Sequence, residues 1–78
     1  MSNRVCCYAN ESFYDSTAGG YVVAVITENE PGYRTLEGGY PDVLDAKAEA
    51  ARRNTESGLS WDEVLDIVAS SMAAGRVR

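Results

Sequence analysis

Residues 21–27 limit what this chain can fold into more than any other segment, because they have the composition of a buried β-strand. Five of the seven are β-branched and one is aromatic, and both kinds of side chain favour strands. Successive strand residues point to opposite faces, and both alternating sets, one starting at Tyr21 and the other at Val22, are apolar. We therefore expect a central strand with helices on one face and a partner surface or a second copy on the other.

Two further segments are expected to pair with this central strand. Residues 4–9 are apolar and include a β-branched and an aromatic residue, which predicts a short first strand. Residues 29–32 predict a type II turn, because Pro31 presets φ at its second position and Gly32 supplies the positive φ at its third. Residues 33–36 can then return beside the central strand as a hairpin.

The segment between the first two strands, residues 10–20, is rich in turn-forming residues and predicts a loop. Phe13 and Tyr14 lie within it, and both are expected to fold back onto the body of the domain. Two glycine pairs, at 19–20 and 38–39, are interpreted as loop residues that separate the predicted strands and helices. Neither pair has the spacing of a phosphate-binding loop, so no cofactor site is predicted from them.

A first helix is predicted to start after Asp42, whose side chain can accept a hydrogen bond from the first turn. Alanines give the following residues a high helix propensity. Ala46 and Ala50 are four residues apart, so they line one face that can lie close to a sheet. We expect Val43 and Leu44 to anchor the start of this helix and Gly58 to follow its C-cap.

A second helix is predicted from a capping box, in which Ser60 and Glu63 exchange side-chain to backbone hydrogen bonds. Leu59 and Val64 are placed to form a hydrophobic staple across this start. Gly75 is expected to stop the helix. Its core-facing side is predicted from apolar residues that recur at helical spacing: Trp61, Val64, Leu65, Val68 and Met72.

These elements predict one α+β domain that spans residues 1–78, because a chain of this length has room for only one core. The expected architecture is a small antiparallel sheet of two to three strands with a C-terminal helical hairpin packed on one face. The element order is β-β-β-α-α. A core this small gives marginal stability, which favours support from a partner or a homodimer.

The cysteine, histidine and hydropathy content argues against several kinds of site. Cys6 and Cys7 are neighbours that point to opposite faces of a strand, so we expect no disulfide between them. The chain has no histidine, and a zinc site would therefore need an unusual set of ligands; no metal is predicted. No apolar run reaches the roughly 18 residues of a membrane span, and no signal-type segment follows the first residues. We expect a cytoplasmic protein.

Catalysis and nucleic-acid binding are also disfavoured. Without histidine there is no usual general base, and the single lysine, Lys47, is expected on an exposed helix face, so no enzyme is predicted. The net charge is −5, and from Glu11 to Glu49 eight acids stand against only Arg34 and Lys47. Such a surface repels nucleic acid. The alternative is that this acidic stretch mimics nucleic acid and inhibits a host defence or DNA-processing enzyme.

The leading prediction is a small, non-catalytic protein-binding or regulatory module. Its partner is expected to be another protein or a second copy, because tyrosine is enriched at recognition surfaces and the central strand is apolar on both sides. The predicted contact surface joins the turn to the exposed face of the strand: Asn29, Glu30, Pro31, Gly32, Tyr33, Arg34, Tyr21 and Val23.

A resemblance is carried by residues 20–33, GYVVAVITENEPGY, and by Ala46, Ala50, Asn54, residues 58–60 and residues 67–72. These segments are similar to small uncharacterised proteins of actinobacteria and their bacteriophages. The resemblance covers roughly residues 20–72 and contains no catalytic motif. It implies an accessory protein that binds a host factor or supports an assembly.

Overall fold

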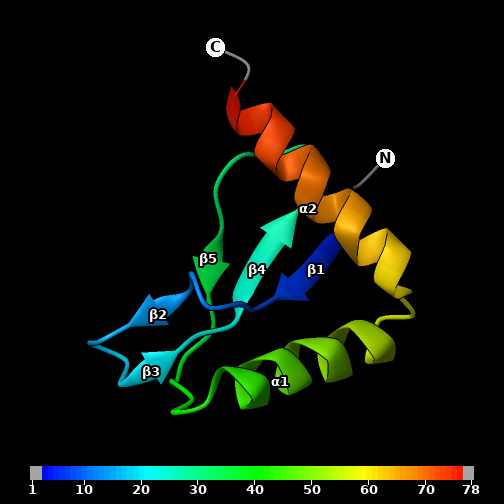
Figure 1. Cartoon of the computed structure of the whole chain (residues 1–78). Helices are drawn as coiled ribbons and strands as arrows, with labels where there is room; N and C mark the ends of the chain where they lie inside the picture. Colours follow the sequence, from blue (N-terminus) through cyan, green and yellow to red (C-terminus); the bar gives the residue numbers. More distant parts are fainter. Residues whose placement is uncertain (1–2, 77–78) are drawn as a thin grey trace.

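The computed structural model describes residues 3–76 and has the predicted α+β architecture, with strands first and two helices at the C-terminal end. Figure 1 shows a three-stranded antiparallel sheet that lies between the two helices, with a separate two-stranded ribbon beside it. The elements are β1 (Val5–Tyr8), β2 (Tyr14–Asp15), β3 (Gly20–Tyr21), β4 (Ala24–Thr27), β5 (Arg34–Thr35), α1 (Val43–Glu56) and α2 (Trp61–Arg76).

The strand β4 occupies the middle of the larger sheet, whose order is β1-β4-β5, and it is antiparallel to both neighbours. The central position predicted for this segment is therefore confirmed, but its length is not. Tyr21 belongs to β3, where it exchanges two backbone hydrogen bonds of 2.8 Å with Tyr40. The Val22 N–H then bonds the Phe13 carbonyl. The chain thus changes pairing partner between β3 and β4, which divides the predicted strand.

The predicted hairpin is confirmed, since β5 returns antiparallel to β4 and Gly32 has a positive φ of 80°. A second reversal precedes it: Asn29 has a φ of 63°, and the Glu30 N–H bonds the Thr27 carbonyl. Gly32 is the third residue of the predicted turn, after Pro31 at the second position, and a type II turn requires a positive φ at the third position. On its outer edge, β5 has no further strand among residues 3–76.

The segment predicted as a loop, residues 10–20, contains β2 and the start of β3, so that prediction is wrong in part. The glycine pairs do not only mark loops; they also allow close packing of the backbone. A Cβ on Gly20 would collide with the backbone carbonyl of Tyr40, and a Cβ on Gly39 would lie 2.5 Å from the carbonyl oxygen of Ala18. The two pairs therefore let distant segments of backbone approach closely, which is what the absence of a side chain permits.

The start and end of α1 follow the predicted signals. The Asp42 carboxylate accepts a hydrogen bond of 2.9 Å from the Leu44 N–H. At the other end Gly58 has a φ of 79°, and the Leu59 N–H reaches back to the Asn54 carbonyl, which is the Schellman arrangement. Leu44, however, is 66% exposed, so the prediction that it anchors the helix is wrong.

The capping box of α2 is confirmed: Ser60 and Glu63 exchange hydrogen bonds of 3.0 and 3.2 Å. Leu59 packs on the same core cluster as Val64, as the staple requires. Gly75 does not stop the helix, because α2 continues through it to Arg76.

The buried face of α2 differs from the predicted one. Val64, Ile67 and Ser71 are its buried residues, and Val68 packs at the edge of their cluster. The predicted face runs along an adjacent stripe, and most of it is exposed: Trp61, Leu65 and Met72.

The core consists of two clusters on opposite sides of the sheet, one beneath each helix, so the prediction that the two helices pack together on one face is wrong. Alternating residues of β1 and β4, including Cys6 and Ile26, pack against Ile67 of α2. The other cluster joins Val23 to Ala46 of α1 and to the remaining small residues of that helix face. Both alternating sets of the central segment are thus covered within the chain, so the expectation that a partner covers one of them is wrong.

Candidate protein-binding groove

The predicted contact surface is only partly brought together. Residues 29–34 are all exposed, as expected for a binding surface. The turn does not project freely, because the Asn29 N–H donates to the Ser70 hydroxyl at 3.0 Å and the Ser71 hydroxyl donates to the Glu30 carbonyl. These two neighbouring serines attach the β4–β5 connection to α2.

Two residues of the predicted surface lie elsewhere. Val23 is 1% exposed and belongs to the cluster beneath α1, so it cannot contact a partner and that prediction is wrong. Tyr21 is half-buried at the edge of the same cluster, where its ring packs edge-on against Tyr14 at 5.2 Å. Phe13 folds back onto the core as predicted, whereas Tyr14 remains 59% exposed.

Four aromatic rings form a continuous row across the surface. Trp61 stacks on Tyr8 with a centroid distance of 6.4 Å, and Phe13 meets Tyr8 edge-on at 6.3 Å. Tyr33 completes the row with an edge-on contact to Phe13 at 4.9 Å. The two end residues are well exposed, Trp61 by 60% and Tyr33 by 58%. The row joins β1, the loop that follows it, the β4–β5 connection and α2.

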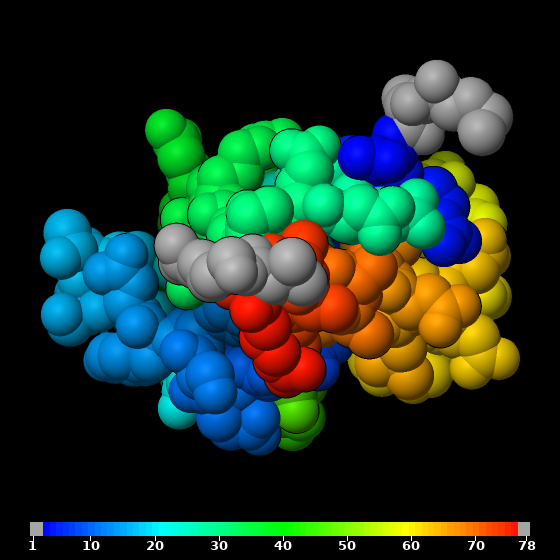
Figure 2. Space-filling model, turned by 90° about the horizontal axis from the view of Figure 1, so that it is seen from above, coloured from blue at the N-terminus to red at the C-terminus, as the bar shows by residue number. Residues whose placement is uncertain are grey.

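A groove of about 540 Å³ lies between this row and α2. Figure 2 shows the C-terminal half of α2, orange to red, running between the green β4–β5 connection and the blue segment that follows β1. We call this hollow the aromatic groove and define it by its main apolar residues: Tyr8, Phe13, Tyr33, Val68 and Met72.

The lining of the aromatic groove is mostly apolar and uncharged. None of the residues that line it carries a carboxylate, an ammonium or a guanidinium group. Two of its polar side chains have partners within the chain: the Ser71 hydroxyl donates to the Glu30 carbonyl, and the Asn10 side chain accepts from the Ser12 N–H. Pockets of this volume with mostly apolar walls bind small ligands or single side chains of a partner.

A second hollow of about 540 Å³ lies on the other side of Tyr8, against α1. Its charged groups, Lys47 and Glu11, form an ion pair at 3.4 Å. Burial raises the pKa of the Cys7 thiol on its wall and raises the pKa of the neighbouring Cys6 to about 11, so both sulfurs are protonated at neutral pH. Among residues 3–76, no three potential metal ligands come together.

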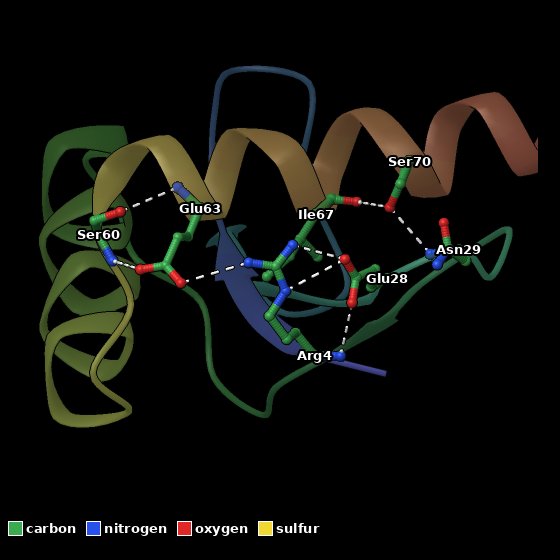
Figure 3. A network of polar contacts seen from close by, with 7 residues as sticks. All are labelled: Arg4, Glu28, Asn29, Ser60, Glu63, Ile67 and Ser70. Carbon is green, nitrogen blue, oxygen red and sulfur yellow. Dashed lines mark hydrogen bonds and ion pairs between the residues drawn. The ribbon is translucent and has the colours of Figure 1, made fainter. Parts of the chain in front are cut away.

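A polar network ties β1 and β4 to α2 (Figure 3). Arg4 forms an ion pair with Glu28 at 2.7 Å and another with Glu63 at 3.4 Å. The Glu28 carboxylate also accepts the backbone N–H of Arg4 at 3.2 Å. Residues next to β1 and β4 are thereby tied to the first turn of α2.

Stability is expected to fall in acid through this network. Hydrogen bonds from Arg4 lower the pKa of Glu28 below its ordinary value of 4.5. A carboxylate with a lowered folded-state pKa contributes stability above the ordinary value and loses it as the pH drops through the folded value. Denaturation measured from pH 7 downward should therefore show a loss that begins near pH 4.5. Glu28→Gln should be less stable at pH 7 and lose less on acidification. An unchanged acid profile in this variant would contradict the assignment.

Sequence reasoning placed Tyr33 and Gly32 in the site and missed the rest of the aromatic groove. The sequence pattern predicts Met72 in the core and Tyr8 in the first strand, and neither residue is part of the predicted contact surface. The available signal was that α2 carries more apolar residues than one face can bury.

Within residues 3–76, no helix combines the length and apolar character needed to cross a bilayer. Comparison of the chain with protein-family models, curated proteins and solved structures gave no match.

Proposed function

We propose that this chain is a non-catalytic protein-binding module, which receives an apolar side chain of its partner in the aromatic groove. One observation carries the proposal: an uncharged hollow of about 540 Å³ is lined by three connected rings, those of Tyr8, Phe13 and Tyr33, and Tyr33 is more than half exposed. Exposed aromatic residues around a pocket are the usual anchors of protein interfaces. In the context that the sequence resemblance implies, the partner is a host factor.

The groove is also held in shape before a partner arrives. Ser70 and Ser71 attach the β4–β5 connection to α2, and Phe13 packs on the core beneath Tyr33. A preformed site loses less conformational entropy on binding than a flexible one. The fixed loop therefore supports a role in binding and not only in folding.

The acidic surface gives weaker support to the alternative, a mimic of nucleic acid. Several acids of the predicted stretch are already paired with basic residues: Glu28 with Arg4, and Glu49 with both Arg52 and Arg53 at 2.6 Å. A paired carboxylate presents less charge to a partner than a free one. We therefore favour the groove over the acidic surface as the binding site.

The test is affinity capture from an actinobacterial lysate with the tagged protein and two tyrosine variants. Tyr33→Ala shortens one end of the aromatic row, and Tyr14→Ala is its matched control, because Tyr14 is equally exposed but lies outside the groove. A partner retained by the wild type and by Tyr14→Ala should be lost with Tyr33→Ala. Measured with the purified partner, the Kd should rise at least about tenfold.

Salt dependence separates the two candidate functions. Contact through the uncharged groove should persist at high salt, whereas binding by a mimic should weaken steeply with salt and with neutralisation of Glu30 and Glu37. A partner whose affinity is unchanged by Tyr33→Ala, with circular dichroism showing an intact fold, would refute the proposed function.

A further inference from the structure

The outer side of α2 carries an arrangement of charge that does not belong to the aromatic groove. Asp62, Ala69 and Arg76 are seven residues apart, which is close to two helical turns, so they lie along one line. All three are exposed. The line runs from an acid through a small residue to a base, with Ala69 at its midpoint.

Apolar residues flank this line at nearly equal distances from the midpoint. Leu65 lies four residues before Ala69 and is 40% exposed, while Met72 lies three residues after it and is 55% exposed. Beyond them, Trp61 is exposed at the acidic end. We call these residues the outer stripe of α2: Trp61, Asp62, Leu65, Ala69, Met72 and Arg76.

A surface of this kind is complementary to itself when two copies meet with their α2 helices antiparallel. Rotation by two-fold symmetry about Ala69 places Asp62 of each helix opposite Arg76 of the other, about 10 Å from the axis. The same rotation brings each Leu65 close to the opposing Met72, and the small Ala69 lets the two backbones approach. Antiparallel helices also align their dipoles favourably. A parallel pair would instead oppose like charges.

We propose that a second copy of this chain docks on the outer stripe, with the two α2 helices antiparallel and related by a two-fold axis near Ala69. The occupant is the chain itself because the charges of the stripe complement their own reversed order. Trp61 and Met72 belong to both surfaces, whereas Tyr33 and Phe13 lie outside the outer stripe, so a variant of Tyr33 changes the aromatic groove without changing the dimer contact.

The test measures the dimer dissociation constant by sedimentation velocity over a series of concentrations of the full chain. Asp62→Arg and Arg76→Glu each create two like-charge contacts in the antiparallel dimer. Each single variant should therefore weaken dimerisation at least about tenfold at low salt. An equimolar mixture of the two single variants should restore dimerisation as a heterodimer, and the double variant should restore it as a homodimer.

The restoration separates docking from a role within the helix. Asp62 and Arg76 also stand where the dipole of α2 favours them, so a purely structural role predicts that the double variant is the least stable and associates no better than the singles. Tyr33→Ala should dimerise like the wild type, which keeps this test apart from that of the groove. A wild-type chain that stays monomeric at every concentration, or single variants that dimerise as the wild type does, would overturn the proposal.

Discussion

Replacing Asn54 with leucine is expected to lower the free energy of unfolding by about 3 kcal/mol, because it leaves two backbone groups without partners. Asn54 is 6% exposed, and its side chain both accepts from the Cys7 N–H and donates to the Cys7 carbonyl at 2.8 Å. The two bonds close the outer edge of β1 against α1. Denaturant unfolding followed by circular dichroism measures the loss.

Two variants keep this result interpretable. Thr55→Ala changes the neighbouring exposed residue of α1 and should leave stability almost unchanged. Asn54→Asp keeps the acceptor for Cys7 N–H but sets a carboxylate against the Cys7 carbonyl, so it should also destabilise the fold. If Asn54→Leu were as stable as the wild type, the edge of β1 would not depend on this side chain.

Replacing Gly20 with alanine is expected to cost about 3 kcal/mol, because the new methyl group would overlap the backbone carbonyl of Tyr40. A backbone atom cannot swing away as the end of a flexible side chain can. Relief would require Tyr40 to withdraw and break its two hydrogen bonds with Tyr21. The melting temperature should fall sharply, and β3 should lose its protection from hydrogen exchange.

Gly75→Ala is the matched control for this substitution. Its Cβ would make an ordinary contact of 3.7 Å with Pro31, and the substitution removes a glycine from the last turn of α2. The variant should therefore be as stable as the wild type or gain up to about 1 kcal/mol. Equal effects of the two glycine substitutions would show that the approach of Gly20 to Tyr40 does not matter.

The starts of both helices and the end of α1 could be predicted because their signals are local. Asp42 caps α1, the Ser60 and Glu63 pair starts α2, and Gly58 closes α1 through contacts within a few residues of each. The hairpin of β4 and β5 was predictable for the same reason, since Gly32 supplies a conformation that other residues rarely adopt.

The orientation of α2 could not be predicted from its own sequence. Apolar residues occupy two neighbouring stripes of this helix, and the packing of Ile67 against β4 decides which of them is buried. Exposure of Trp61 and Met72 follows from that choice. The aromatic groove could not be predicted for a related reason. Tyr8, Phe13 and Tyr33 come from segments that only the folded sheet brings together.

Asn54 is a case in which a closer interpretation of the sequence was possible. It follows Ala46 and Ala50 at intervals of four residues, so it continues the buried face of α1. A polar side chain on such a face needs a hydrogen-bond partner. The identity of that partner, the backbone of Cys7, depends on where β1 lies and is therefore a tertiary property.

The two edges of the three-stranded sheet differ in what they permit. Asn54 and α1 close the edge at β1, while β5 ends the sheet on the other side without a neighbouring strand among residues 3–76. Growth by strand addition can then proceed from β5 only. Two copies that joined there would leave the three-stranded sheet with no open edge, so strand addition to this sheet would stop at a pair.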